Sequence, residues 1–363
     1  MSSEFGNLLR VGVFGQSHGK AIGVTIHGLP AGESIDLDEL NAFLDRRRGG
    51  RGGLTTARKE TDIPEFISGL ENGVTCGFPL CAVIQNNDQH SKDYSELLDK
   101  PRPSHADFTA NVKWGGHADM RGGGHFSGRL TAPLCVAGGI AKQILARRGV
   151  YVGAHLASVW EEEDQRFPLH PTKELFDAIA AKDFPVLDDA AGARMQAAIL
   201  KAREELDSVG GTIECAAIGL PVGLGEPMFD GIENRLAQGL FGIPGLKGVE
   251  FGSGFAGSRR RGSENNDPFA MENGHVAAVT NNAGGILGGI TDGMPVVFRV
   301  AMKPTPSIAK EQKTVSLSQQ ADAALIIHGR HDPCIAQRAV PVVEAVTAIV
   351  LLYILLEGNH GTF

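Results

Sequence analysis

The sequence has few cysteines and no excess of positive charge, and each shortage excludes a class of protein. Its five cysteines form no CxxC pair and are odd in number, so neither a disulfide framework nor a structural zinc site is expected. The 363 residues carry a formal net charge of -8. A general nucleic-acid-binding protein normally presents a broad basic face, so any cationic site here must be local. We predict a cytoplasmic protein whose cysteines are buried as small apolar residues.

The sequence also lacks the motifs of several enzyme classes. It contains no GxxxxGK[ST], HExxH, GxSxG or DxDxDG pattern, so a P-loop, hydrolase chemistry and a resident metal are not predicted. The glycine-rich stretch GGILGGITDG, residues 284–293, lacks the strand, GxGxxG and helix order of a dinucleotide site. The sequence therefore predicts no nucleotide-binding motif.

Long apolar runs are scarce, and only AVPVVEAVTAIVLLYILL, residues 339–356, approaches membrane length. A membrane-spanning helix needs about 20 apolar residues, whereas this run contains Pro341 and Glu344. We therefore predict a buried core helix. The stretch MSSEFGNLLRVGVF has no basic segment followed by an apolar one, so a signal peptide is not expected.

Local patterns predict one domain, residues 1–363, of the α+β class. Strands and helices follow no regular strand-helix-strand period, which argues against a doubly wound parallel sheet. The predicted strands lie within residues 11–14, 21–32, 66–88, 212–223 and 294–304. The predicted helices cover residues 36–48, 131–149, 173–183, 190–211, 229–242 and 339–356. Gly138 and Gly139 indicate a close helix crossing or a close approach to a sheet. The polar, glycine-rich residues 247–274 are predicted to form a long loop, and the composition around residues 251–274 fits closure over bound ligands.

The stretch RRRGGRGG, residues 46–53, places four arginines among four glycines. The first three end a predicted helix, where cations are stabilising, but Arg51 has no such explanation. Arginine in a glycine-rich loop suits phosphate and carboxylate ligands, because its planar fork binds two oxygens at once. Other basic residues in Gly- or Pro-marked loops are Arg58, Arg102, Arg121, Arg129, Arg259, Arg260, Arg261, Lys303 and Arg330. A small polyanionic ligand and a solvated surface both explain this pattern.

Histidines occupy the same kind of loop. They are His18, His105, His125, His328 and His331. With an unperturbed pKa of about 6.5, a histidine can donate a proton near neutrality, although a loop histidine is often inert. Asp332 precedes Pro333 and can orient a base, accept a proton or cap the helix that follows.

Taken together, these loops resemble the motifs of the chorismate synthase family, in the family's order and along nearly the whole chain. FGQSHG resembles the family's FGESHG, and DRRRGGRGGLTTARKETD resembles RRRPG...TTxRxExD. NNDQHSKDY resembles NxDxxSxDY, PRPSHAD resembles RPGHAD, and RGGGHFSGRLTA resembles RGGGRSSARETA. The stretches NNAGGILGGIT, KPTPSI and GRHDPCIAQRAVPVVEA are close to the family's own sequences.

The resemblance implies a carbon-oxygen lyase of the shikimate pathway of aromatic amino acid biosynthesis. It would convert 5-enolpyruvylshikimate 3-phosphate into chorismate by trans-1,4-elimination of phosphate, using reduced FMN without net redox change. The implied fold is a β-α-β sandwich with a helical layer between antiparallel sheets, assembled as a homotetramer. The phosphates and carboxylates of these ligands would explain a basic pocket in an acidic chain.

The resemblance also implies residue roles. His18 would protonate the departing phosphate, His105 would set the protonation of the reduced flavin, and Asp332, with Ser127, would help flavin N5 to take the ring proton. The expected flavin-binding residues are His125, Phe126, Ser127, Pro244, Gly245, Gly288, Lys303, Pro304, Thr305, Pro306, Ser307 and Arg330. The expected substrate-binding residues are Arg47, Arg48, Arg51, Arg58 and Arg129.

The chain departs from the family pattern at several positions. His125 and Phe126 stand where the family has Arg-Ser, Leu130 replaces a glutamate, and Gly53 replaces a substrate-side arginine. Because Arg51 lies two residues before Gly53, we hypothesise that Arg51 or His125 restores part of the lost contacts.

Two other interpretations stay open on the sequence. The departures are consistent with a non-catalytic flavin- or polyanion-binding protein descended from the enzyme. An oxidoreductase that consumes NADPH would need a nucleotide motif, which the sequence lacks. Within the enzyme interpretation, either the chain reduces its own FMN or an external flavin reductase supplies it.

Overall fold

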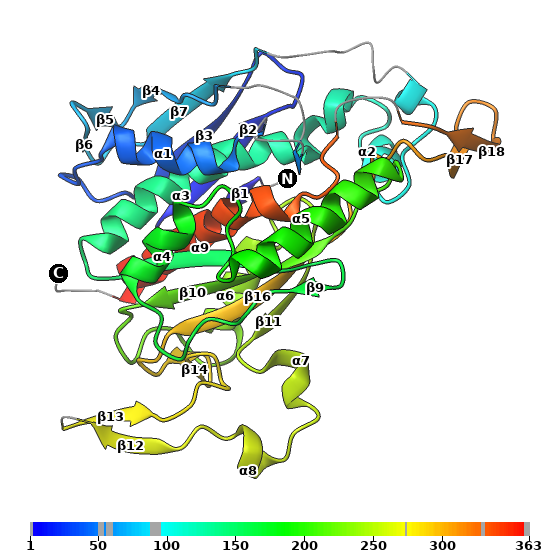
Figure 1. Cartoon of the computed structure of the whole chain (residues 1–363). Coiled ribbons are helices and arrows are strands. Elements are labelled where there is room, and N and C mark those ends of the chain that lie inside the picture. Colours follow the sequence, from blue (N-terminus) through cyan, green and yellow to red (C-terminus); the bar gives the residue numbers. More distant parts are fainter. Residues whose placement is uncertain are drawn as a thin grey trace.

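Two five-stranded sheets lie on either side of a helical layer in the computed structural model (Figure 1). All strand pairs within the two sheets are antiparallel, and the three layers confirm the predicted α+β fold. The structure describes residues 3–49, 54–55, 61–87, 96–272, 274–327 and 331–358. Arg51, Arg58 and Arg330, which are predicted to bind ligands, lie outside the described residues, as do Gly53 and His328.

The first sheet has the strand order β1-β2-β3-β7-β4. Its strands are β1 (Glu4–Phe5), β2 (Arg10–Gly15), β3 (Ala21–His27), β7 (Leu80–Gln85) and β4 (Glu65–Ser68). Alternation along β3 buries Ile22, Val24 and Ile26, and Val24 pairs with the buried Ala82 of β7. These residues give the sheet an apolar face toward the helices. A small hairpin follows β4 and consists of β5 (Leu70–Glu71) and β6 (Val74–Thr75).

The second sheet has the order β11-β16-β10-β8-β9. Its strands are β11 (Leu246–Phe251), β16 (Val296–Met302), β10 (Gly211–Ile218), β8 (Tyr151–Val159) and β9 (Glu162–Glu163). On one face, the Sγ of Cys215 contacts Oγ1 of Thr347 in helix α9 at 3.7 Å. On the other face, Phe176 packs over Gly153, where an added Cβ would lie 2.3 Å from the ring. Helices therefore cover both faces, and those of the outer face are α4 (Lys173–Ala180) and α5 (Asp189–Glu204).

The central layer consists of α1 (Leu37–Arg47), α3 (Thr131–Ala146) and α9 (Ala336–Gly358), with α6 (Ile232–Leu240) beside α9. Helix α3 contacts strands of both sheets. It crosses α9 closely at Gly138, where an added Cβ would lie 2.2 Å from the Cβ of Ala345. At Gly139 an added Cβ would lie 2.4 Å from Cδ1 of Leu40 in α1, so both glycines mark close helix crossings.

The long apolar run forms α9. Its most apolar stretch has the length and composition of a membrane span, but 94% of it is buried inside the protein, which confirms the prediction of a core helix. Glu344 is 1% exposed within this helix. Its carboxylate accepts from Nη2 of Arg46 in α1 at 2.6 Å and from Nζ of Lys142 in α3. Two ion pairs thus join the three central helices.

The prediction of a loop over residues 247–274 is wrong in part, because this segment contains short regular elements. It includes most of β11, together with α7 (Gly254–Gly257), α8 (Gly262–Asn265) and β12 (Phe269–Glu272), which pairs with β13 (His275–Ala278). Residues 252–282 form an arm that projects from the second sheet (Figure 1). Elements this short have no apolar periodicity for a sequence to reveal. Asp267 holds the base of the arm by accepting from the backbone N–H groups of Asn282 and Ala283, each at 2.7 Å.

The remaining elements are short. They are α2 (Asp107–Lys113), the hairpin of β14 (Ile286–Leu287) and β15 (Ile290–Thr291), and the hairpin of β17 (Gln312–Ser316) and β18 (Ala321–Leu325). Three cysteines, Cys135, Cys215 and Cys334, are buried as predicted. Contrary to the prediction, Cys81 is half-buried and Cys76 is exposed. Cys76 follows the short strand β6 at the edge of the molecule.

Candidate active site

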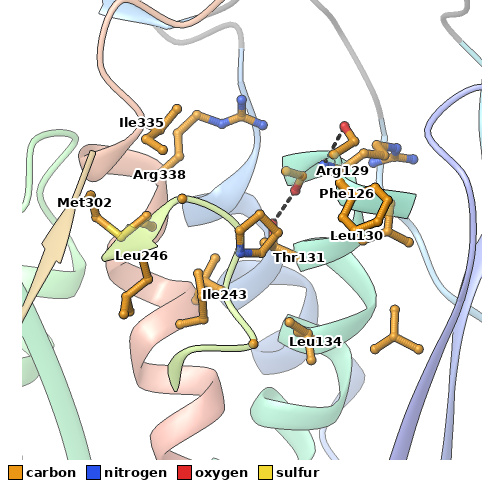
Figure 2. A pocket seen from close by; sticks show the side chains of 18 of the residues that line it. Phe126, Arg129, Leu130, Thr131, Leu134, Ile243, Leu246, Met302, Ile335 and Arg338 are labelled. Carbon is orange, nitrogen blue, oxygen red and sulfur yellow. Dashed lines mark hydrogen bonds between the residues drawn. The ribbon is translucent and has the colours of Figure 1, made fainter. Parts of the chain in front are cut away.

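A cavity of about 860 Å³ lies where the C-terminal end of α1, the N-terminal ends of α3 and α9, and the segment after α6 meet (Figure 2). Small-molecule sites commonly have volumes of about 300–1,000 Å³. Helix N-termini carry partial positive charge, so two of these helix ends favour an anion at the cavity. The size and the helix ends indicate a site for a small anionic ligand.

The cavity has a charged end and an apolar end. Figure 2 shows the guanidinium groups of Arg129 and Arg338 at one end and the side chains of Leu134, Ile243 and Leu246 toward the other. The apolar wall continues along one side of α9 through Val342, Val346, Ile349 and Val350. A ligand that combines anionic groups with a flat apolar part matches this division.

Asp62 joins two arginines at the charged end. Its buried carboxylate accepts from Nη2 of Arg47 at 3.0 Å and from Nη1 of Arg129. Burial raises the pKa of Asp62, but Arg47 and Arg129 outweigh burial and hold that pKa below its ordinary value. Arg47 also donates to Oγ1 of Thr131 at 3.2 Å, whereas its buried Nε has no hydrogen-bond partner among the described residues. Two guanidinium groups share one carboxylate, so the cluster keeps a net positive charge. This charge, together with the N–H group at Nε of Arg47, is available to an anion.

Arg338 connects Asp332 to this network. Its Nη1 donates to Oδ2 of Asp332 at 2.7 Å, and its Nε donates to the backbone carbonyl of Arg47 at 2.9 Å. Helix α9 begins at Ala336, so the N-cap position is Ile335 and the alternative of Asp332 as the helix cap is wrong. The Asp332 carboxylate is instead held at the cavity wall.

Three glycines bring His18 and His105 to one loop. Gly122, Gly123 and Gly124 have φ angles of 61°, 89° and 55°, a region that favours glycine. An added Cβ at Gly122 would lie 2.0 Å from Nδ1 of His18, and one at Gly123 would lie 3.2 Å from Nε2 of His105. The RGGGH motif therefore makes room for both rings.

His105 is held by a carboxylate. Its Nδ1 lies 2.8 Å from Oδ1 of Asp107, and Arg102 forms a two-point ion pair with the same carboxylate. Burial lowers the pKa of His105, and Arg102 and Lys303 lower it further against the opposite effect of Asp107. The ring is therefore neutral at neutral pH.

His125 uses both ring nitrogens within the protein. Its Nδ1 lies 2.7 Å from the carbonyl of Gly15, so Nδ1 carries the proton, and its Nε2 lies 2.7 Å from Oγ of Ser3. The neighbouring Phe126 packs against Trp114 at a ring-centroid distance of 5.8 Å. His125 would have to change these hydrogen bonds in order to replace the family's arginine as a ligand contact.

Two predicted flavin segments lie side by side. The backbone N–H of Lys303 donates to the carbonyl of Gly245 at 3.0 Å, and the Lys303 ammonium donates to the carbonyl of Ser104. Burial and then Lys247 lower the pKa of Lys303. The buried Oγ1 of Thr305 has no hydrogen-bond partner among the described residues. These groups present a cation and a hydroxyl to the cavity wall.

Most of the predicted site residues line this one cavity. They are Arg47, His105, His125, Phe126, Ser127, Arg129, Pro244, Gly245, Lys303, Thr305, Pro306, Ser307 and Asp332. The predictions for Arg51, Arg58 and Arg330 fall outside the described residues. Residues from six regions of the sequence thus converge on one volume.

Four predicted residues are not among the wall residues. His18 is buried against Gly122, which does line the cavity. Arg48 pairs with Asp45 of its own helix and lines a separate hollow of about 20 Å³. Pro304 is absent from the wall, and Gly288 lies in the turn between β14 and β15. In the described chain, the structure does not bring Arg48, Pro304 or Gly288 to the cavity.

Some site residues were missed by the sequence prediction. Asp62 and Arg102 line the cavity, and Asp107 contacts His105. Arg102 and Asp107 flank that histidine in PRPSHAD and Asp62 ends TTARKETD, so these motifs could have indicated them. Arg338 lies within the motif GRHDPCIAQRAVPVVEA, but its contact with the end of α1 follows only from the fold. Among the described residues, no group of His, Cys, Asp and Glu side chains could hold a metal ion.

Comparisons with known proteins agree on one family. The family model described as chorismate synthase matches residues 9–356. The chain is 48% identical to a chorismate synthase of Dehalococcoides mccartyi over 359 residues, covering 99% of this chain and 98% of that protein. It is 49% identical to a chorismate synthase of Thermococcus gammatolerans over 346 residues, 95% of each chain. A crystal structure of chorismate synthase superimposes with a TM-score of 0.78 at 28% identity, covering 99% of this chain and 95% of that one.

Proposed function

Because the chain belongs to the chorismate synthase family, we propose that it catalyses the trans-1,4-elimination of phosphate from 5-enolpyruvylshikimate 3-phosphate. The product is chorismate and the cofactor is reduced FMN. The reaction has no net redox change, and it classifies the protein as a carbon-oxygen lyase. The observation that carries this proposal is the convergence of His105, the arginine network and the glycine loop that packs against His18 on one cavity. The whole chain, residues 1–363, acts as a single catalytic domain in this proposal.

The residues of the cavity fit FMN. Ile243, Leu246 and Met302 offer an apolar wall to the flavin ring. The buried hydroxyl of Thr305 lacks a partner among the described residues, and Lys303 supplies a cation for an anionic group. When bound, reduced FMN supplies electron density to the substrate and recovers it.

The arginine network suits the departure of phosphate. Phosphate leaves easily only when its charge is neutralised and a proton is supplied. We assign the charge neutralisation to Arg47 and Arg129, whose shared Asp62 keeps both guanidinium groups in place. We assign the proton to His18, which packs on the glycine loop beside the cavity wall.

The remaining roles follow the same geometry. The lone pair on Nε2 of His105 accepts a proton on the flavin side. The Asp332 carboxylate, oriented by Arg338 at 2.7 Å, assists removal of the ring proton together with Ser127. The apolar walls exclude water, which strengthens each of these electrostatic contacts.

The proposal extends to assembly and partners. We propose a cytoplasmic homotetramer, since the arm exposes large apolar side chains such as Phe255, Met271 and Val276 that another copy would cover. FMN is reduced either by this chain itself or by an external flavin reductase. Gly288, in the turn of an exposed hairpin, would contact the flavin only if a neighbouring subunit brings it there.

The decisive test is an anaerobic assay with chemically reduced FMN and 5-enolpyruvylshikimate 3-phosphate that follows phosphate release and chorismate absorbance together. We expect both products in equal amounts. Binding of both ligands without either product would favour the alternative of a non-catalytic binding protein. Oxidation of NADPH without chorismate would favour an oxidoreductase.

His18→Ala separates binding from chemistry. We expect loss of turnover by roughly 10²–10⁴-fold, the usual contribution of a proton-transfer group, with FMN affinity within a few-fold of the unaltered protein. A variant that keeps full turnover would remove His18 from the mechanism.

A further inference from the structure

We propose that Asp107 is the positioning residue for His105: it fixes the imidazole as the Nδ1–H tautomer, so that Nε2 offers a lone pair to the ligand cavity. The kinetic part of this inference rests on the proposed function. The tautomer itself is a property of the chain and is testable without turnover.

The contacts of Asp107 determine where the proton lies. The side chain is buried, and its Oδ1 meets Nδ1 of His105 at 2.8 Å and Nη2 of Arg102 at 2.7 Å. Its Oδ2 accepts from Nε and the backbone N–H of Arg102 at 2.7 and 3.0 Å. An ionised carboxylate only accepts hydrogen bonds, so Nδ1 must carry a hydrogen. The 3.1 Å approach of Arg102 Nη2 to Nδ1 is then a contact between two donors.

Arg102 keeps Asp107 ionised. Burial raises the pKa of Asp107, but hydrogen bonds from Arg102 and His105 hold that pKa far below its ordinary value. The charged groups that act on His105 are Arg102, Lys303 and Asp107, and with burial their combined effect lowers the histidine pKa. The proton shared between carboxylate and ring therefore stays on Nδ1, and Nε2 stays unprotonated.

The other edge of the ring is open to a ligand. Nε2 has no hydrogen-bond partner among the described residues. It faces Gly123, where an added Cβ would lie 3.2 Å from it and 3.5 Å from the Cβ of Ser127. His105 and Ser127 both line the cavity, so the lone pair lies beside the first predicted flavin segment.

Arg102 also ties this pair to the second flavin segment. Its Nη1 donates to Oγ of Ser307 at 3.2 Å, and Ser307 lines the cavity. All three guanidinium nitrogens of Arg102 thus donate hydrogen bonds within the protein. These bonds hold Asp107, His105 and Ser307 in one rigid group. Its role is to hold these residues rather than to bind the ligand.

The tautomer is measured by long-range ¹⁵N–¹H correlation spectra of the ¹⁵N-labelled, ligand-free protein at pH 8. The signals of His105 are those that disappear from the spectrum of the His105→Gln variant. We expect a neutral ring protonated at Nδ1. In Asp107→Asn, we expect the amide oxygen to take the position of Oδ2, where it still accepts from Nε and the backbone N–H of Arg102. The amide NH₂ then takes the position of Oδ1 and faces the ring. Because NH₂ is a donor, Nδ1 must present its lone pair to it. We therefore expect the tautomer to reverse to Nε2–H.

The kinetic expectation follows from that reversal. Replacing the carboxylate behind a catalytic histidine by an amide traps the wrong tautomer and costs up to about 10⁴-fold in kcat in another enzyme class. We expect Asp107→Asn to lower kcat by roughly 10²–10⁴-fold, with KM and the Kd for FMN changed less than about threefold. Asp107→Glu, which retains a carboxylate, should keep Nδ1–H and recover part of kcat. Asp230→Asn, which breaks a surface ion pair to Arg235 at 3.0 Å, is the matched control and should change neither property.

Each outcome decides the inference. A wild-type His105 that is protonated at Nε2 or is an imidazolium at pH 8 overturns it, and this result needs no variant. Retention of Nδ1–H and of kcat in Asp107→Asn also overturns it. If the wild-type protein makes no chorismate but the tautomer still reverses in Asp107→Asn, the positioning role stands and the proposed function fails.

Discussion

At the scale of single residues, the candidate site depends on a glycine that leaves room for a histidine. Gly122 has a φ of 61°, and its missing side chain leaves the space that His18 occupies. Ordinary L-residues adopt this backbone region at a cost of about 1–2 kcal/mol, but the clash with His18 is a separate effect. The effect of backbone strain and the effect of displacing the His18 ring can therefore be separated by comparing two glycine substitutions.

Gly122→Ala should displace His18, because the new Cβ would lie 2.0 Å from Nδ1. We expect kcat to fall at least about 100-fold, in line with loss of a proton donor, while FMN affinity changes only a few-fold. The measurement is steady-state turnover with a fluorescence titration of FMN. Gly149→Ala is the control, since Gly149 also has a positive φ, 77°, but open space at its Cβ. Equal losses in both variants would contradict the role of the clash.

Arg51 carries the hypothesis that a neighbouring arginine replaces the one missing at Gly53. Because a charge-assisted hydrogen bond contributes about 1.5–3 kcal/mol, Arg51→Ala should raise the Kd of the substrate by roughly tenfold or more. Calorimetric titration of the substrate measures this change. Arg259→Ala, in the arm, should leave the Kd unchanged. An unchanged substrate affinity in Arg51→Ala would show that Arg51 does not compensate.

At the scale of elements, one buried carboxylate, that of Glu344, joins α1, α3 and α9. Burial raises the pKa of Glu344, but Arg46 and Lys142 outweigh it and lower that pKa from 4.5 to about 2. The folded-state pKa is thus below the unfolded one. The stabilisation is therefore present above about pH 4.5 and is lost as the pH falls toward about 2.

Glu344→Gln should destabilise the protein by about 3–5 kcal/mol at pH 7, because two cations lose their buried partner. The difference in unfolding free energy from the wild-type protein should shrink as the pH falls from 5 toward 3. Urea unfolding at several pH values measures it. Glu162→Gln, which breaks an exposed pair to Arg194 at 2.9 Å, should cost less than about 1 kcal/mol. A difference for Glu344→Gln that is independent of pH would contradict this account.

At the scale of the whole molecule, the arm exposes apolar surface that a monomer would leave in water. Met271 and Val276 pair across the β12–β13 hairpin and are 69% and 60% exposed. Exposed apolar pairs of this kind are typical of protein interfaces. They support burial of the arm against another copy in the proposed homotetramer.

Met271→Lys combined with Val276→Glu should weaken that assembly and still keep the hairpin, because opposite charges across two strands are compatible with pairing. We expect the wild-type protein to be a tetramer by light scattering and the double variant to be smaller. Leu200→Lys, at an exposed position of α5, should remain a tetramer. A monomeric wild-type protein, or a double variant that stays tetrameric, would contradict the assignment of the arm.

Much of the fold could be predicted from local pattern. The apolar stripe of residues 36–48, the glycines at the crossings of α3 with α9 and α1, and the uniformly apolar α9 follow from periodicity and composition, and each is present in the structure. The short elements of the arm were missed, since they bury almost nothing and leave no periodic signal. The packing of the two sheets on the helical layer could not be derived from periodicity, because it depends on contacts between distant residues; the family resemblance implied it. The strand order within each sheet was not predicted.

The sequence by itself determined which residues are available for chemistry: its motifs name His18, His105, Asp332 and the arginine-rich loops, and they carry the family resemblance. Only the tertiary structure decided how these residues act together. Asp62 became the shared partner of Arg47 and Arg129, and Asp107 fixed the ring of His105. Arg338 reached Asp332 and the end of α1. The physical reason is that motif and composition act locally along the chain, whereas charge pairing, burial and the proton position of a histidine depend on how folding orients neighbouring side chains and which distant groups it brings into contact.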